Sequence, residues 1–404
     1  MNVRKPLSRI PKTVVVVAVA SALATTGAFA ASAVKSTLKA RPSEVAATSA
    51  AQPKGLPKPP FTKDFFGMSV GAELTLLGEN QFDNEMNLMK KVGVHWVRAL
   101  IPWGLVERDG PDNDNWILID RLVNMVQAEG MQLLGIVDNP PKWAETNVPP
   151  VPTCVQQPPF DIGAYADFTA QVAARYGSAR FAAIELENAP NLPGGAWDSA
   201  NPCAYTRLMQ ASYAAIKAVD PNVTVLTAGL GAQRNDETAQ AGDVFFANMY
   251  TYGAAGHFDV LSWHPYSYPC FPSASCPKDR PWYRTDTVRQ AMIDHGDGAK
   301  PIWATEFGAP TGGVAGDGHQ DENNQAAMMV DAMKHWVAFP FAGPFFVFTF
   351  RDYGTNPNDK SDWFGLESHS GKYKKLSFYT YQYEATSKSN VTIPQNVLDG
   401  VPHA

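Results

Sequence analysis

The sequence lacks an excess of basic side chains, and this absence argues against polyanionic partners. Its 404 residues hold 33 Lys and Arg against 39 Asp and Glu. Without residues 1–30, which contain four basic and no acidic side chains, 29 basic face 39 acidic residues, a net charge of −10. Phosphate backbones and anionic lipid surfaces repel an acidic chain. We therefore expect neither nucleic acid nor a membrane surface as a partner.

Cysteine is scarce, and the four cysteines are Cys154, Cys203, Cys270 and Cys276. Their spacings do not suit zinc and no second histidine stands at ligand spacing, so we expect no metal and no other cofactor. In an exported protein an even number of cysteines suggests disulfides, here with three possible connectivities. Cys270 and Cys276 could close a short loop. Cys154 would then pair with Cys203, and four free thiols are the alternative.

The N-terminus has the three parts of a secretory signal. Residues 1–30 combine a basic region, an apolar region at 14–24 and the small-x-small sequence AFA at 28–30. This order is typical of a signal peptide that is removed on export, and an uncleaved anchor is the alternative. No cysteine follows the apolar region, which argues against a lipid anchor. We expect a secreted or cell-envelope protein with no membrane insertion after cleavage.

No repeat of 20–50 residues is visible, and beyond an Ala/Pro-rich linker short apolar runs alternate with amphipathic stretches. The runs predicted as strands are 65–70, 96–103, 132–138, 181–188, 223–230, 258–266, 301–308 and 344–350. Strands that alternate with helices indicate a parallel sheet, and near-continuous apolar strands fit a sheet covered on both faces. Eight such units favour an α/β fold, a single-domain (β/α)8 TIM barrel.

The expected organisation is a signal peptide (1–30), a linker (31–60), the barrel domain (61–388) and a C-terminal tail (389–404). A monomer is expected. In such barrels the active site lies at the carboxyl ends of the strands. Polar residues gather at these ends, which a hydrophobic core does not require. The residues concerned are Arg98, Trp103, Asp138, Asn188, His264, Tyr266, Glu306 and Arg351.

Three stretches at these ends resemble motifs of clan A glycoside hydrolases. IELENAPN (184–191) is similar to the strand-four motif of that clan, and WATEFG (303–308) to the strand-seven motif that carries the nucleophile. FDVLSWHPYSYP (258–269) resembles the strand-six His-x-Tyr segment. In order and spacing the likeness is strongest to bacterial secreted proteins of glycoside hydrolase families 39 and 5, over nearly all of 65–385.

The resemblance implies a retaining enzyme that acts on O-glycosidic bonds of an oligosaccharide or polysaccharide. Two carboxyl groups roughly 5 Å apart then flank the bond, one as nucleophile and the other as acid and then base. Glu306 matches the nucleophile, and Arg98 resembles the arginine that keeps it ionised. Asn188 matches a residue that binds the sugar 2-hydroxyl. His264 and Tyr266 look like the pair that orients nucleophile and sugar.

The departure from the family is Ala189, which stands where the acid/base glutamate belongs. Alanine cannot transfer a proton, and general acid help typically contributes about 10²–10⁴ in rate. Three explanations are open: natural loss of activity, a deliberate knockout, and recruitment of another acid such as Glu187 or Asp138. The expected function is thus an exported glycoside hydrolase that is impaired at Ala189. The alternative is an inactive carbohydrate-binding protein on the same barrel.

The role of Glu187 depends on how strand four ends. In a regular strand Glu185, Glu187 and Ala189 share one face, and Glu187 lies roughly 6–7 Å deeper in the barrel than Ala189. At that depth it could reach a leaving group only through water or a backbone bend. A buried carboxylate paired with an arginine is the alternative role of Glu187.

Four further residues are candidates for contact with the glycan: Asp138, Trp103, Trp143 and Arg351. Aromatic rings at strand ends can stack on sugars, and packing in the core is the alternative for each tryptophan.

A rival motif, GMSVG at 67–71, fits the G-x-S-x-G pattern of serine hydrolases with Ser69 as the nucleophile. That pattern needs a sharp turn from strand to helix at the serine. Here a helical pattern does not begin until about Gln81, so a serine hydrolase is a minor alternative.

Overall fold

The computed structural model describes residues 63–402, except 72, 112–113, 233 and 276–278. The expected signal peptide and linker lie outside the described residues, and so does Cys276. No described helix is long and apolar enough to cross a membrane.

All eight predicted strands are present. Their bounds are β1 Phe66–Ser69, β2 Trp96–Pro102, β3 Gln132–Asp138, β4 Ala183–Leu186, β5 Thr224–Leu226, β6 Leu261–Trp263, β7 Ile302–Phe307 and β8 Ala342–Phe348. The largest differences from the predicted lengths are in β4, β5 and β6, where the chain leaves the sheet before the polar residues at their carboxyl ends.

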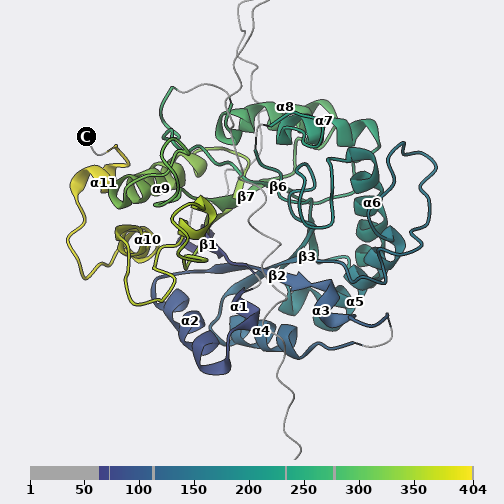
Figure 1. The fold of residues 1–404 in the computed structure, drawn as a ribbon, viewed down its shortest axis with the longest axis horizontal. Coiled ribbons are helices and arrows are strands. Elements are labelled where there is room, and N and C mark those ends of the chain that lie inside the picture. Colours follow the sequence, from purple (N-terminus) through teal and green to yellow (C-terminus); the bar gives the residue numbers. More distant parts are fainter. Residues whose placement is uncertain (1–62, 72, 112–113, 233, 276–278, 403–404) are drawn as a thin grey trace, which may run out of the picture.

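The strands form one parallel sheet in the order β5-β4-β3-β2-β1-β8-β7-β6. Isolated parallel bridges join Leu226 to Val260 and Leu230 to Trp263, which brings the β5 and β6 edges together. Figure 1 shows the helices as a ring around these strands. The predicted (β/α)8 barrel is therefore confirmed.

Helices connect the strands on the outside of the barrel. The α-helices are α1 Glu73–Leu76, α2 Glu79–Lys91, α3 Trp103–Val106, α4 Ile117–Ala128, α5 Ile162–Arg180, α6 Pro202–Val219, α7 Gly242–Thr251, α8 Thr285–Asp294, α9 Glu322–Trp336, α10 Leu376–Thr386 and α11 Gln395–Asp399. The 3₁₀-helices are η2 Lys63–Phe65, η3 Pro281–Arg284 and η4 Lys360–Trp363.

Side-chain caps begin several of the long helices. Asp161 accepts from the amides of Gly163 and Ala164 at the start of α5, and Asn201 accepts from Ala204 N at the start of α6. These caps satisfy main-chain donors that have no partner inside the helix.

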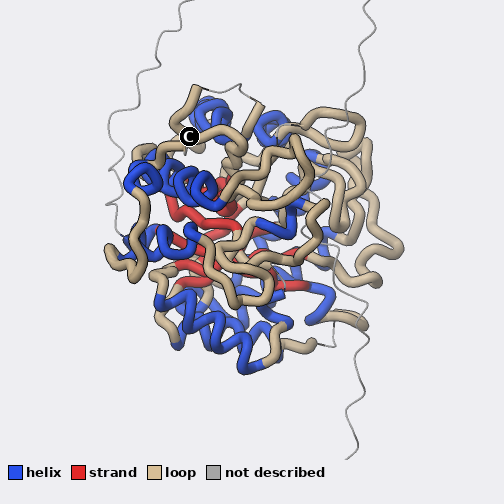
Figure 2. Tube along the Cα trace, turned by 60° about the vertical axis from the view of Figure 1, so that its left-hand side comes forward, coloured by secondary structure: helices blue, strands red, loops and turns tan. Residues whose placement is uncertain are grey.

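The connections at the two ends of the barrel differ in length. Long segments follow the carboxyl ends of β3, β4, β6 and β8, whereas short turns lead from helices into the next strands. Figure 2 shows the resulting loops in tan, gathered largely at one side of the strands. The fold thus provides long loops at the end where barrel sites lie.

The barrel interior is filled in layers. An apolar layer contains Ala183 of β4, Trp303 of β7 and Val260 just before β6, all buried. Two residues further along the same chain segments stand Glu185, Thr305 and Ser262, which are fully buried as well. Because strand side chains alternate between faces, these polar residues point into the same interior. Apolar packing thus closes the floor and polar side chains begin above it.

One disulfide joins Cys154, in the segment between β3 and α5, to Cys203 in the first turn of α6. This confirms the predicted Cys154–Cys203 pair. Cys270 is also disulfide-bonded, and its predicted partner, Cys276, lies outside the described residues. Among the described cysteines none is free.

Candidate active site

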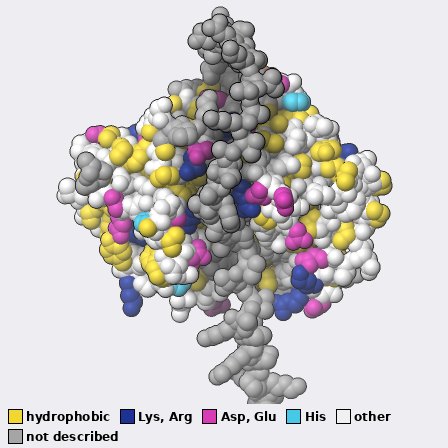
Figure 3. Space-filling model, turned by 45° about the horizontal axis from the view of Figure 1, so that its top comes forward, with side chains coloured by type: hydrophobic (Ala, Val, Ile, Leu, Met, Phe, Trp, Pro, Cys, Tyr) yellow, Lys and Arg dark blue, Asp and Glu magenta, His cyan; other side chains and the backbone are white. Residues whose placement is uncertain are grey.

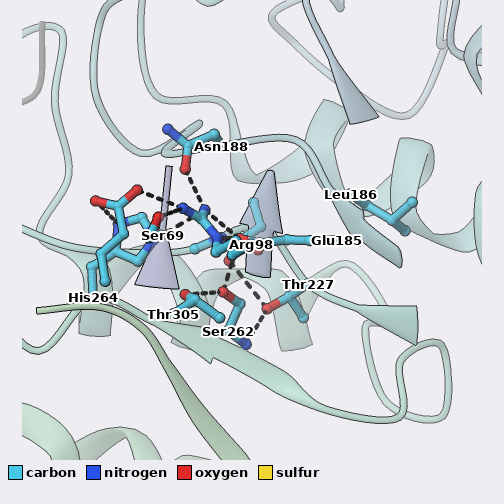
Figure 4. A network of polar contacts seen from close by, with 12 residues as sticks. Ser69, Arg98, Glu185, Leu186, Asn188, Thr227, Ser262, His264 and Thr305 are labelled. Carbon is cyan, nitrogen blue, oxygen red and sulfur yellow. Dashed lines mark hydrogen bonds and ion pairs between the residues drawn. The ribbon is translucent and has the colours of Figure 1, made fainter. Parts of the chain in front are cut away.

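Arg98 of β2 is the centre of the polar interior. It is 1% exposed, and its Nε and Nη2 donate to the two carboxylate oxygens of Glu185 at 2.7 and 2.9 Å. Its Nη1 donates to Glu306 Oε1 at 2.7 Å and to Ser69 Oγ at 2.9 Å. Nη2 also donates to Asn188 Oδ1 at 2.9 Å. Figure 4 shows Ser69, Glu185 and Asn188 around the guanidinium of Arg98.

The charge of Arg98 is secured by its neighbours. Burial by itself lowers the pKa of a guanidinium, but the carboxylates of Glu185 and Glu306 more than offset this effect and raise the pKa of Arg98 above its usual value. Arg98 is therefore a permanent cation between two carboxyl groups.

Both carboxylate oxygens of Glu185 have hydrogen-bond partners. Besides Arg98, its Oε1 accepts from Gly229 N at 2.8 Å and from Ser262 Oγ at 2.9 Å. Gly229 also packs against the ring of His264, where an added β-carbon would lie 1.9 Å from Nε2. A glycine is therefore required at this point. The arginine partner predicted for Glu187 belongs in fact to Glu185.

Glu306 lies on the other side of Arg98, at the carboxyl end of β7. The register of β7 against β8 shifts between Ala304 and Phe307, which marks a bulge or irregularity. Thr305 contacts Ser262 inside the barrel while its neighbour Glu306 contacts Arg98. Two successive side chains of a regular strand would point to opposite faces, so the irregular register is what turns Glu306 into the interior.

Two further side chains hold Glu306 Oε2. Tyr266 Oη donates to it at 2.9 Å, and His264 Nδ1 lies 3.5 Å away. Burial and the charge of Glu306 raise the pKa of Tyr266 well above its usual value, so the phenol keeps its proton and donates. Burial, with Arg98 nearby, lowers the pKa of His264 to about 3. The imidazole is therefore neutral, and its contact with Glu306 is not an ion pair.

Strand β4 does not stay regular beyond Leu186. Glu187 and Ala189 both have positive φ, 71° and 49°. The regular strand in which Glu185, Glu187 and Ala189 would share one face is therefore not present, because each left-handed residue turns the chain out of the alternating pattern. The same change of direction lets Asn188 face Arg98 three residues after Glu185.

Glu187 points away from the Arg98 network into a second buried group. Its Oε2 accepts from Trp197 Nε1 at 3.0 Å, and its carboxyl is within hydrogen-bonding reach of Asp138. Burial and the charge of Asp138 raise the pKa of Glu187 well above its usual range. Burial also raises the pKa of Asp138 to about 6, although hydrogen bonds from Asn139 N and Glu187 oppose this shift.

Ala189 is half-buried and is held by its main chain. Its N donates to Gly229 O at 3.1 Å, and its carbonyl accepts from Leu192 N at 3.0 Å. A methyl group offers no donor, acceptor or proton.

A hollow of about 350 Å³, part of it open to solvent, lies at this end of the barrel. Its polar lining includes Arg98, Asp138, Asn188 and Glu306, and its apolar lining includes Val70, Leu100, Ile136 and Phe348. The hollow therefore joins the predicted nucleophile and Asp138 in one space.

Three residues predicted to contact the glycan do not line this hollow. Trp103 is fully buried, donates to Glu107 Oε2 at 2.7 Å and stacks on Phe168, so no face of its ring is free for a sugar. Trp143 is partly buried and packs edge-on against Trp103. Trp103 thus packs between α3 and α5, and Trp143 donates to Glu107 O at 2.7 Å.

The guanidinium of Arg351 forms two ion pairs. Its side chain pairs with Glu85 of α2 and, at 2.9 Å, with Glu367. These contacts fasten the segment after β8 to the outer ring of helices, and the structure does not place Arg351 with the Arg98 network.

Sequence reasoning missed the contacts made by Glu185, Ser69 and Trp197. The oxygen of Ser69 accepts from Arg98, and no described histidine is paired with it, so the geometry of a serine hydrolase is not present. Among the described residues no cluster of His, Cys, Asp or Glu could hold a metal ion. Trp197 follows a loop without regular spacing, and nothing in the sequence marks its contact with Glu187.

Comparisons with known proteins agree with this geometry. The family model of cellulases (glycosyl hydrolase family 5) matches residues 58–339. No curated protein matches the sequence. Among solved structures, a family 39 glycoside hydrolase from the gut symbiont Bacteroides cellulosilyticus WH2 has a TM-score of 0.61 at 19% identity, with 81% of this chain and 64% of that chain covered.

Two other solved structures show the same fold. A monomeric beta-xylosidase from Caulobacter crescentus CB15 has a TM-score of 0.56 at 21% identity, covering 80% of this chain and 68% of that one. The beta-glycosidase BGL167 has a TM-score of 0.58 at 14% identity, covering 83% and 99%. The chain thus spans just under two thirds of the Bacteroides protein and nearly all of BGL167.

Proposed function

The chain belongs to the cellulase family, glycosyl hydrolase family 5, and from this premise we propose that it cleaves O-glycosidic bonds of a glycan with Glu306 as the nucleophile. The observation that carries the proposal is the setting of Glu306 in the hollow. One carboxylate oxygen accepts from Arg98 at 2.7 Å and the other from Tyr266 at 2.9 Å. These donors fix the carboxylate in one orientation while it lines the space that a sugar would occupy.

The proposed reaction has two steps. An oxygen of Glu306 attacks the anomeric carbon, the bond from that carbon to the leaving oxygen breaks, and a glycosyl ester forms. Water then cleaves the ester, which releases the sugar with retained configuration and restores the Glu306 carboxylate. Asn188, Tyr266 and His264 are positioned to contact the sugar or the nucleophile. No metal or redox cofactor takes part in this proposal.

The leaving oxygen needs a proton, and Ala189 cannot supply one. Unless another side chain supplies this proton, glycosides with poor leaving groups are cleaved more slowly, by a factor on the order of 10²–10⁴ relative to a site with an effective acid. Glycosides with good leaving groups need little acid help and should be cleaved faster.

The test uses dinitrophenyl glycosides of a panel of sugars. We expect the wild type to hydrolyse at least one of them, and Glu306→Gln, which keeps the shape of the side chain, to lose that activity. Ala189→Glu should raise the turnover of the corresponding phenyl glycoside. A wild type with no turnover on the panel, or activity that survives Glu306→Gln, would contradict the proposal.

Ala189 also supports a second candidate function, a carbohydrate-binding protein without activity on the same barrel. It predicts that glycans bind to the wild type while no dinitrophenyl glycoside is turned over, even after Ala189→Glu. Binding measured by calorimetry on the same panel separates the two functions.

Export is the remaining part of the proposal. The signal-like residues 1–30 and the Cys154–Cys203 disulfide both suit an oxidising compartment outside the cytoplasm. The acidic chain, with basic and acidic side chains interspersed on the described part of the face in Figure 3, suits a neutral glycan better than a polyanion. We propose that it acts there as a monomer.

A further inference from the structure

Asp138 and Glu306 face one another across the barrel mouth. Counting around the sheet order, β3 stands four strands from β7 in either direction, so the two strands are diametrically opposed. Asp138 is the last residue of β3 and Glu306 the penultimate residue of β7. Both line the same hollow and each is 8% exposed. A glycoside attacked by Glu306 would therefore have Asp138 on its far side.

Asp138 has a second carboxyl group behind it. The pairing of β3 with β4 aligns Val137 with Leu186, so Asp138 comes level with Glu187 as the strands end. The positive φ of Glu187 and the hydrogen bond from Trp197 direct its carboxyl toward Asp138 rather than down the barrel. Glu187 is 1% exposed and does not line the hollow. Only Asp138 of this pair can touch a substrate.

The pair must hold a proton. Glu187 Oε1 is buried and has no hydrogen-bond partner, while burial and the nearby charge of Asp138 raise the pKa of Glu187. Two ionised carboxylates only accept hydrogen bonds and repel one another, whereas one proton turns the contact into a hydrogen bond. Burial raises the pKa of Glu187 well above its usual range, and Glu187 does not line the hollow, so Glu187 keeps its proton and donates to Asp138. Asp138 lines the hollow and burial raises its pKa to about 6, so a proton on Asp138 is the one that can reach a substrate.

We propose that Asp138 is the acid and base of this site in place of Ala189, with Glu187 as the residue that positions it. The inference rests on the proposed function of Glu306. In the first step Glu306 bonds to the anomeric carbon while the Asp138 proton passes to the departing oxygen, which leaves as an alcohol. In the second step the oxygen of a water molecule attacks the anomeric carbon of the ester while Asp138 takes a proton from that water. The bond to Glu306 breaks and its carboxylate is released.

The decisive comparison is Asp138→Asn against the wild type on two glycosides of one sugar. The phenyl glycoside needs a proton on its leaving group, and the dinitrophenyl glycoside does not. We expect kcat/KM of Asp138→Asn to fall by about 10²–10⁴ on the phenyl glycoside and by less than about tenfold on the dinitrophenyl glycoside. Azide, which attacks without a base, should accelerate the variant on the dinitrophenyl glycoside and yield a glycosyl azide.

A substrate-binding role alone gives a different result. If Asp138→Asn lowers kcat/KM equally on both glycosides, or leaves kcat/KM on the phenyl glycoside unchanged, the inference is overturned. In either case dinitrophenyl glycoside turnover that depends on Glu306 leaves the proposed function standing. The proposed function is tested separately. It requires that the wild type turns over a dinitrophenyl glycoside and that Glu306→Gln loses this turnover. The melting temperature of Asp138→Asn shows whether the variant is folded.

Glu187 is tested by the pH profile rather than by the rate. Its hydrogen bond lowers the pKa of Asp138, so Glu187→Leu should move the alkaline limb of kcat/KM for the phenyl glycoside to higher pH. Glu187→Gln retains a donor and should leave that limb in place. The dinitrophenyl glycoside should show no such limb. If Glu187→Leu leaves the alkaline limb of the phenyl glycoside unmoved, or Glu187→Gln moves it as far, the positioning role is refuted.

Discussion

Arg98 holds two carboxyl groups inside the barrel with one positive charge. Burying an ion is costly unless it is paired and hydrogen-bonded, and Arg98 meets this condition through contacts with Glu185 and Glu306. Glu185 adds hydrogen bonds from Gly229 and Ser262. The network is therefore formed before any ligand binds, and Glu306 needs no reorganisation to present its oxygens.

Asp138 gives the first prediction, on stability. Its folded pKa of about 6 lies above the usual value of 3.8, so the folded state binds a proton more tightly than the unfolded chain. Its contribution to stability is complete below pH 4 and is lost as the pH rises through about 6. Asp138→Asn cannot titrate. We expect the melting temperature of the wild type, relative to that of Asp138→Asn, to fall between pH 4 and pH 7.

Thermal unfolding monitored by circular dichroism in matched buffers checks this difference. A constant difference over that range would show that the pKa of Asp138 is not raised in the folded protein. The comparison between the two proteins removes the contributions of titrating groups that do not contact Asp138, which both proteins share.

At the scale of elements, the ends of strands depart from what the sequence predicts. The eight strands follow from apolar runs, because a covered parallel sheet requires them. Glu187 and Ala189 adopt positive φ although neither is a glycine. The irregular register of β7 is not predicted by any residue type in that strand. These departures depend on tertiary contacts such as Trp197 with Glu187, which no local pattern encodes.

The disulfide gives the second prediction. Cys154 and Cys203 lie 49 residues apart and join the segment before α5 to α6. Closing a loop of this length in the unfolded chain accounts for roughly 4 kcal/mol by the chain-entropy model, with a usual range of about 2–4 kcal/mol. The double variant Cys154→Ser/Cys203→Ser should lose stability of this order.

Denaturant unfolding of the double variant and of the wild type, both with Cys270 unchanged, measures the loss. An unaltered midpoint would mean that the link does not restrict the unfolded chain. Glu306-dependent turnover should persist in the folded variant, since neither cysteine lines the hollow.

At the scale of the whole molecule, the barrel class was predictable because it depends on the alternation of strands and helices alone. The carboxyl ends of the strands then pointed to Arg98, Asn188, His264, Tyr266 and Glu306, and the structure brings these five together. Trp103, Trp143 and Arg351 also follow strands, but packing and ion pairs with neighbouring elements draw them away. A strand end predicts the mouth of a barrel, and tertiary contacts decide which side chains enter it.

Export gives the third prediction. Expressed with residues 1–30 in a bacterium that exports proteins, the chain should be recovered outside the cytoplasm with its N-terminus at Ala31. Intact-mass spectrometry measures the cleavage. The difference in mass before and after reduction gives the number of disulfides. Recovery of the uncleaved chain from the membrane fraction would instead indicate an anchor.

Ala189 is joined to the fold through main-chain hydrogen bonds that any residue with an amide proton can make. Codons for alanine and glutamate can differ by a single base. A lineage could thus exchange a methyl group for a carboxylate at this position in one mutational step, without passing through a poorly folded ancestor. Selection on reaction rate or on ligand retention, rather than on folding, would then decide which residue persists.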